Sequence, residues 1–232
     1  MIIVADAHVS MTNGNHASFF DMLSSLEETS SDIVFLGDIF DLWISLPRYE
    51  EEIQKRFLAW CSANRKQRRI GFIEGNHEFF VVERNRDCFS WSDGACWAEE
   101  GFLFVHGDLI NRADKNYLRF RRLSKNLFTK TLVRFLPFGP SLVYKMKRGL
   151  KKTNQAFRLG LPRQALEQFA EQSFSQGHRT IVVGHFHEHF HFEQSGASLQ
   201  VLPAWYSDGE IARLDRTSGQ ITTGPWETML SH

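Results

Sequence analysis

Metal-binding side chains recur in five short clusters along the first 190 residues. The clusters are Asp6 and His8, Asp38 and Asp41, Asn76 and His77, His106 and Asp108, and His185 and His187. Carboxylate, imidazole and carboxamide groups suit Mn, Fe or Zn better than Ca or Mg, which prefer shells of oxygen. Seven of these ten side chains are counted as strong ligands, more than one ion needs, so they predict two ions that share a carboxylate. Such a pair, about 3.5–4 Å apart, can clamp a phosphoryl group for in-line attack.

Each cluster directly follows a short apolar run that predicts a buried strand. These runs are Ile2–Ala5, Ile33–Leu36, Ile70–Ile73, Phe102–Val105 and Ile181–Val183. Apolar residues at helical spacing within 19–26 and 51–64 predict helices between the first three strands. Strands alternating with helices indicate a layered α/β fold, in which ligands bind beyond the carboxyl ends of the strands. Alternation within 199–203, 211–214 and 221–223 predicts a hairpin or edge strands in the tail.

Composition limits the class of protein. The chain has 232 residues, 42% hydrophobic and 23% charged, which excludes a disordered chain or a coiled coil. We expect one domain over residues 1–232. The sequence has no run of about 18 apolar residues, so it predicts no membrane-spanning helix. No leader peptide is evident before the first strand. The three cysteines show no CxxC spacing, so we expect a reducing, cytoplasmic location.

A formal net charge of zero conceals a basic segment at about residues 112–163. This segment, called the insertion below, holds fifteen Lys or Arg residues and one acidic residue, Asp114. Large apolar residues alternate with the basic ones at roughly helical spacing. One interpretation is an amphipathic helix pair packed on the core; another is a surface that meets an anionic membrane or amphiphile. Nucleic acid is disfavoured, because the segment is rich in apolar residues.

The five clusters resemble the sequence motifs of the calcineurin-like metallophosphoesterases. The matching motifs are Asp-x-His, Gly-Asp-x-x-Asp, Gly-Asn-His-Glu, His-Gly-Asp and Gly-His-Phe-His. The resemblance implies a four-layer α/β/β/α sandwich with an inserted helical lid and two divalent ions, with Mn expected first and Fe or Zn as alternatives.

The resemblance also implies a role for each residue of the clusters. The first ion would be held by Asp6, His8, Asp38 and His187. The second would be held by Asp38, Asn76, His106 and His185, with Asp38 as the bridge. Asp38 and His77 would be catalytic, His77 by stabilising charge on the phosphoryl oxygens or protonating the leaving group. Asp41 and Asp108 would orient the ligands.

A closer resemblance follows the fourth cluster. The run Asp-x-x-Tyr-x-x-Phe-Arg, from Asp114 to Arg121, is similar to one in the UDP-2,3-diacylglucosamine pyrophosphatases of lipid A synthesis. In that family the run leads into a helical lid that holds acyl chains. The resemblance implies that the insertion is such a lid, with substrate contacts from Asp114, Tyr117, Arg121 and Asn154.

Four positions depart from that family's pattern. His77 and Glu78 stand where the family has Arg-Asp, Phe186 stands where it has Thr, and Ala113 stands where it has Asp. An arginine clamps a phosphate with two parallel hydrogen bonds, which a histidine cannot reproduce. The resemblance therefore supports the family's metal chemistry in this chain more strongly than it supports the family's substrate.

The sequence favours a dimetal phosphohydrolase in which a metal-bridging hydroxide attacks the pyrophosphate of UDP-2,3-diacylglucosamine or a similar lipid-linked nucleotide. The alternatives are a phosphoesterase for another nucleotide or phosphorylated metabolite, a nuclease of the same superfamily, and a non-catalytic scaffold. No protein partner is implied. We expect a cytoplasmic protein, peripheral at the inner face of the membrane if the insertion meets lipid.

Overall fold

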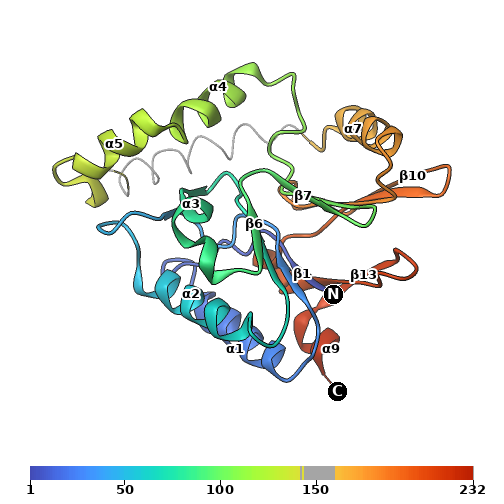
Figure 1. The fold of residues 1–232 in the computed structure, drawn as a ribbon, viewed down its shortest axis with the longest axis horizontal. Helices are drawn as coiled ribbons and strands as arrows, with labels where there is room; N and C mark the ends of the chain where they lie inside the picture. The colour runs from blue at the N-terminus through green and yellow to red at the C-terminus, as the bar shows by residue number, and fades with distance from the viewer. Residues whose placement is uncertain (142, 144–159, 232) are drawn as a thin grey trace.

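Two mixed sheets form the centre of the molecule (Figure 1). The computed structural model describes residues 1–141, 143 and 160–231. The first sheet has six strands in the order β13-β12-β1-β2-β4-β6. Its strands are β1 (Ile2–Val4), β2 (Ile33–Phe35), β4 (Ile70–Ile73), β6 (Trp91–Asp93), β12 (Glu210–Leu214) and β13 (Ile221–Pro225). The strands β1, β2, β4 and β6 run parallel to one another, and β12 and β13 form an antiparallel hairpin at the edge next to β1.

The second sheet has five strands in the order β10-β11-β9-β8-β7. Its strands are β7 (Cys96–Glu99), β8 (Phe102–Val105), β9 (Thr180–Val183), β10 (Phe190–Gln194) and β11 (Ala197–Val201). The strands β8, β9 and β11 run parallel, with an antiparallel strand at each edge. A separate pair joins β3 (Trp43–Ile44) to β5 (Glu78–Phe79).

Hydrophobic contacts build four layers. The helices α1 (His16–Glu27) and α2 (Glu52–Asn64) pack on one face of the first sheet, and the core there includes Phe19, Phe57 and Phe72. The opposite face packs on the second sheet through Val34, Phe104, Val182 and others. The helix α7 (Arg163–Ser175) covers the outer face of the second sheet. The predicted α/β fold is confirmed, and the layers follow the order α/β/β/α.

Short elements join these layers. They are α3 (Val81–Asn85), the 3₁₀ turn η1 (Arg86–Cys88), α8 (Trp205–Asp208) and α9 (Trp226–Leu230). No helix within the described residues is long and apolar enough to cross a bilayer.

Two helices of the insertion, α4 (Lys115–Ser124) and α5 (Leu127–Phe135), extend along one side of the body (Figure 1). Each begins at a side-chain cap, because Asp114 accepts from the Tyr117 N–H and Asn126 accepts from the Thr129 N–H. Neither helix contains a buried residue. The interpretation of an ordinary helix pair packed on the core is therefore wrong for α4 and α5. Residues 142 and 144–159 of the insertion, including the predicted substrate residue Asn154, lie outside the described part of the chain.

The structure divides the five predicted strands between the two sheets, three in the first and two in the second. The segment around Trp91 and Trp97 has a loop-like sequence, but it forms β6 and β7, one at the edge of each sheet. The two indole rings stack with centroids 4.8 Å apart. This aromatic packing between the sheets stabilises both strands, although their polar residues give them no strand pattern in the sequence.

Candidate metal centre

The predicted ligands come together where the carboxyl ends of strands from both sheets meet. Asp6 and His8 follow β1, Asp38 follows β2 and Asn76 follows β4. From the second sheet, His106 follows β8, and His185 and His187 follow β9. A hydrogen bond from the His185 N–H to Asp6 Oδ2, 2.7 Å long, ties the loops of the two sheets together.

The backbone turns sharply at the ligands themselves. Five of them have a positive φ between 42° and 69°, a conformation that costs non-glycine residues about 1–3 kcal/mol each. They are Asp6, His8, Asp38, His185 and His187. Backbone hydrogen bonds between loops hold two of these turns: the Asp6 N–H donates to Gly37 O and the His8 N–H to Asp38 O. Strain concentrated at five ligands indicates a site selected for geometry rather than for stability.

Two glycines make close approaches at this centre. A Cβ on Gly37 would lie 2.4 Å from the His106 ring, and one on Gly75 would lie 2.1 Å from Asp38 Oδ1. Gly37 also has φ +88°, which only glycine adopts without strain. Both positions therefore exclude any side chain while the ligands keep these places.

Three groups of side chains are compact enough to hold a cation. Within each group the ligand atoms lie within 4.8 Å of one another. The groups are Asp6, His8 and His187; His8, Asp38 and His77; and Asp38, His106 and His185. The first group holds three of the four residues predicted for one ion, and the third holds three of the four predicted for the other. Asp38 belongs to the second and third groups, and the second shares His8 with the first, so Asp38 lies between the two predicted ion sites.

Buried polar atoms at the centre lack hydrogen-bond partners. Among the described residues, these atoms include Asp6 Oδ1, Asn76 Oδ1 and His106 Nε2. Such atoms cost free energy unless a partner compensates them, and all three belong to predicted ligands. A divalent cation would supply that partner, so the residues present fit a metal pair.

Burial adjusts the protonation of the imidazole ligands. It lowers the pKa of His8 to about 4, and together with the nearby His106 it lowers the pKa of His185 to about 4. Both rings are thus neutral at pH 7 and offer a lone pair. Burial would also lower the pKa of His106, but Asp38 and Asp108 hold it well above its usual value.

The buried Glu78 carboxylate joins two of the ligand loops. Its Oε2 accepts from the Asp38 N–H at 2.8 Å and from the Gly75 N–H at 2.7 Å, and its Oε1 accepts from the Ile39 N–H at 2.6 Å. Burial and the neighbouring Asp38 carboxylate raise the pKa of Glu78 to about 7. Glu78 therefore fixes the loop of the bridging Asp38 against the loop that carries Asn76.

His77 lies at the exposed side of the centre. Its Nδ1 is 2.6 Å from the Asp41 carbonyl oxygen, which can only accept, so Nδ1 carries the proton. Its Nε2 is 3.8 Å from Asp38 Oδ2 and about a third of the side chain is exposed. His77 thus adjoins both the bridging carboxylate and solvent, a suitable place for a group that acts on substrate.

The sequence of this chain matches the family model of the calcineurin-like phosphoesterases over residues 1–189. The chain belongs to the calcineurin-like phosphoesterase family. It is therefore a metal-dependent phosphoesterase, and the resemblance seen in its five clusters is confirmed.

Its relatives in this family include hydrolases of a nucleotide-linked lipid. The chain is 26% identical to the UDP-2,3-diacylglucosamine hydrolase of Pseudomonas syringae, over 96% of this chain and 95% of that protein. It is 22% identical to the enzyme of the same name from Vibrio vulnificus, over 98% of each chain. An archaeal phosphodiesterase of known structure is similar at a TM-score of 0.49 and 13% identity, covering 97% and 99% of the two chains.

The residues predicted to orient ligands or contact substrate have specific partners in this phosphoesterase. Asp108 Oδ1 lies 3.2 Å from His106 Nδ1, so Asp108 is placed to orient that ligand. Asp41 meets His77 through its backbone carbonyl. Tyr117 and Arg121 both donate to Asp108 Oδ2, and Asp114 caps α4 at its exposed start. The structure thus gives Tyr117 and Arg121 a supporting position behind a predicted ligand.

Three further residues adjoin the centre although the sequence assigned them no role there. Besides Glu78, the Lys125 ammonium donates to Gly75 O at 2.7 Å, and the Tyr206 ring packs edge-on to His8 with centroids 6.1 Å apart. The Gly-Asn-His-Glu motif contains Glu78 and could have indicated it. Nothing in the pattern distinguishes Lys125 among fifteen basic residues of the insertion.

Proposed function

We propose that this phosphoesterase hydrolyses the pyrophosphate of UDP-2,3-diacylglucosamine or a closely similar lipid-linked nucleotide. Water would add to one phosphorus while the bridging oxygen leaves with the other phosphate. The observation that carries the chemistry is the presence of two compact ligand groups at one centre, one of Asp6, His8 and His187 and the other of Asp38, His106 and His185, with Asp38 also close to His8.

Two divalent ions, when bound, would activate water and neutralise the charge that develops on the phosphoryl group. Asp6, His8, Asp38 and His187 would hold one, and Asp38, Asn76, His106 and His185 would hold the other. The protein would keep this centre ready through Glu78 and the strained turns described above. Such preorganisation is favourable because the loops need not rearrange during the reaction.

His77 would act on the substrate rather than on the fold. Since its Nδ1–H donates to the Asp41 carbonyl, Nε2 is the atom directed to the reaction. A neutral ring accepts a proton there, and a doubly protonated ring donates one to a phosphoryl oxygen or to the leaving group. We propose the second role, because the oxygen that leaves phosphorus gains negative charge, which a protonated ring can neutralise.

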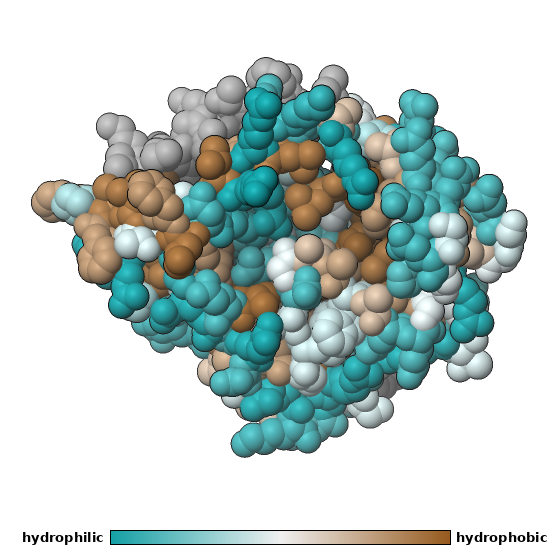
Figure 2. Space-filling model, turned by 45° about the horizontal axis from the view of Figure 1, so that its top comes forward, coloured by the Kyte–Doolittle hydropathy of each residue, from teal (hydrophilic) through white to brown (hydrophobic). Residues whose placement is uncertain are grey.

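The insertion supports a lipid-linked substrate. Among the described residues of the insertion, large apolar side chains are exposed at Phe120, Leu123, Leu127, Phe128, Leu132, Phe135 and Phe138. Hydrophobic residues gather at the left end of the molecule in Figure 2, where Figure 1 places α5. Water-exposed phenylalanine and leucine side chains in this number are unfavourable unless they meet another apolar surface. Acyl chains would provide that surface, in agreement with the substrate named for the relatives.

The test is hydrolysis of UDP-2,3-diacylglucosamine in the presence of Mn²⁺, with release of UMP measured. Mn-dependent release supports the proposal and would show that His77 can replace the arginine of the resembling family. Absence of release, with activity retained on a small phosphodiester, would refute the lipid-linked substrate. It would leave the alternative, a phosphoesterase for another nucleotide or phosphorylated metabolite.

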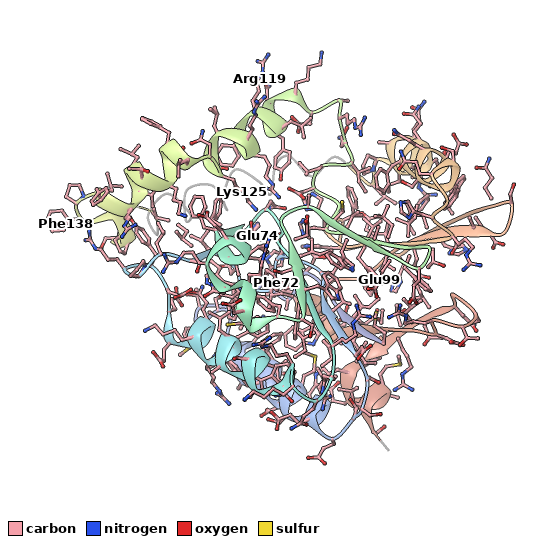
Figure 3. All side chains as sticks on the ribbon, viewed as in Figure 1. Phe72, Glu74, Glu99, Arg119, Lys125 and Phe138 are labelled. Atoms are coloured by element: carbon pink, nitrogen blue, oxygen red, sulfur yellow. The ribbon has the colours of Figure 1, made fainter. Side chains whose placement is uncertain are left out.

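We further propose that the insertion binds an anionic membrane surface, since basic side chains accompany its apolar ones. Arg119, for example, points from α4 away from the body (Figure 3). Cosedimentation with phosphatidylglycerol vesicles but not with phosphatidylcholine vesicles is expected. Equal or no binding to both would contradict this. The cytoplasmic location at the inner face of the membrane stays a prediction.

A further inference from the structure

Three side chains of the insertion reach from one face of α4 toward the metal centre. Tyr117, Arg121 and Lys125, the last at the C-cap of α4, are spaced four residues apart, so they lie along the same side of the helix. Figure 3 shows Lys125 directed from α4 toward Glu74 in the body, whereas Arg119 points the opposite way. No residue of α4 is fully buried, and hydrogen bonds from this face tie the helix to the body.

The first two side chains meet one carboxylate behind a predicted ligand. The Tyr117 hydroxyl donates to Asp108 Oδ2 at 2.8 Å, and Arg121 Nε donates to the same oxygen at 2.6 Å. The other oxygen, Asp108 Oδ1, faces His106 Nδ1 at 3.2 Å. His106 Nδ1 therefore carries the proton, and Nε2 is left to coordinate. Through Asp108, α4 sets the tautomer and orientation of His106.

The third side chain meets the loop of another predicted ligand. The Lys125 ammonium donates to Gly75 O at 2.7 Å and to Glu74 Oε2 at 3.2 Å. These two residues directly precede Asn76 in the chain. Only 12% of the Lys125 side chain is exposed. Glu74 Oε1 also accepts from the Val82 N–H, so the lysine and the strand end form one network. Burial lowers the pKa of Lys125, which reflects how far its ammonium is withdrawn from water.

We propose that α4 braces the second ion site: Tyr117, Arg121 and Lys125 position His106 and Asn76, and an ion held there strengthens the docking of α4 in return. The inference rests on the ligand assignment of the proposed function. Reciprocity follows from thermodynamic linkage, since a helix that favours ion binding must be favoured by the ion to the same extent. All three are positioning residues in this scheme.

The chain offers a matched pair of lysines for the test. The side chains of Lys125 and Lys130 each extend from the insertion to an acidic residue of the body, near β4 and in α3 respectively. Their exposed fractions are similar, 12% and 14%. Lys130 pairs with Glu83, which is 59% exposed on α3 and away from the ligand loop. Lys125→Met and Lys130→Met thus remove the same charge from the same insertion, but only the first releases the loop before Asn76.

The first measurement is Mn²⁺ titration of the metal-free proteins by calorimetry, with thermal unfolding to show that each variant is folded. We expect Lys125→Met to lower the affinity for one of the two ions by about 10–100-fold, the usual effect of losing a contact that supports a ligand. Lys130→Met should leave the affinity for both ions unchanged, and Lys125→Arg should restore part of the loss. Loss of a positive charge alone would strengthen cation binding, so weakening indicates lost positioning. Unchanged affinity in Lys125→Met, or equal weakening in both Met variants, would overturn the inference.

The second measurement needs no variant. Amide hydrogen exchange across Lys115–Ser124 should slow when Mn²⁺ is added to the wild-type protein, because the ion strengthens the docking of α4. Exchange that is indifferent to Mn²⁺, in a protein that binds two ions, would refute the brace and leave the proposed function intact. A wild-type protein that binds no ion would overturn both.

Discussion

Replacing Glu78 by Gln tests whether one buried carboxylate holds the ligand loops together. The carboxylate accepts three backbone N–H groups, from Asp38, Ile39 and Gly75, at 2.6–2.8 Å. Glutamine has the same shape, but one oxygen becomes an NH₂ group that can only donate. If the remaining oxygen keeps the two donors of Oε2, the Ile39 N–H faces the new NH₂ group. Both are then buried without an acceptor.

The expected loss of stability follows from these two donors. Each unsatisfied buried donor costs about 1–3 kcal/mol, which sums to about 2–6 kcal/mol. Removing a buried charge, whose desolvation raises the pKa of Glu78 to about 7, offsets part of this loss. We therefore expect the free energy of unfolding to fall by about 2–4 kcal/mol. Each kcal/mol lowers Tm by about 2–4 °C in a domain of this size.

The assay is urea-induced unfolding of the metal-free protein, with Glu52→Gln as the control. The Glu52 side chain is 86% exposed and pairs only at the surface with Lys55, so its replacement should change stability by less than about 0.5 kcal/mol. A Glu78→Gln protein as stable as the control would refute the idea that this carboxylate joins the two loops.

Three further changes test other parts of the site. His77→Ala should retain both ions and lose about a hundredfold or more in rate, as measured by metal content and turnover; an unchanged rate would remove His77 from the mechanism. Gly75→Ala should abolish tight metal binding, because its methyl group would lie 2.1 Å from Asp38 Oδ1, whereas Gly94→Ala, with open space around it, should not; equal Mn²⁺ affinity in the two proteins would argue against close approach as the reason for Gly75. Phe128→Ser should reduce hydrolysis of an acylated substrate by about tenfold or more, since burying a Phe contributes about 1.5–3 kcal/mol, but spare a small phosphodiester; equal losses on both would assign Phe128 a structural role.

Much of the fold was predictable because its strands are apolar runs buried on both sides. Ile70–Ile73 and Phe102–Val105 have the bounds expected from the sequence, and the other three strands differ by one residue at one end. The division of these strands between two sheets was not evident from their pattern, since a strand buried between two layers has the same composition in either sheet. The resemblance to the phosphoesterases supplied that arrangement.

The ligand positions were predictable because each is defined by its place after a strand. The supporting contacts were not, because they depend on which distant segments meet. The Asp108 contacts of Tyr117 and Arg121, and the path of Lys125 to Gly75, arise only when α4 docks beside the centre. Local spacing carries no information about such a contact, which is why Tyr117 and Arg121 were assigned to substrate alone.

The most direct test of the dimetal account is the metal content of the wild-type and Asp38→Ala proteins after reconstitution with Mn²⁺ and removal of free metal. Two compact ligand groups at one centre predict two ions per wild-type chain, and the place of Asp38 beside both His8 and His106 predicts loss of both ions and of phosphoesterase activity in Asp38→Ala. An Asp38→Ala protein that retains two ions or full activity would contradict the assignment of Asp38 as the bridge, and a wild-type protein that holds fewer than two ions would contradict the two-ion centre.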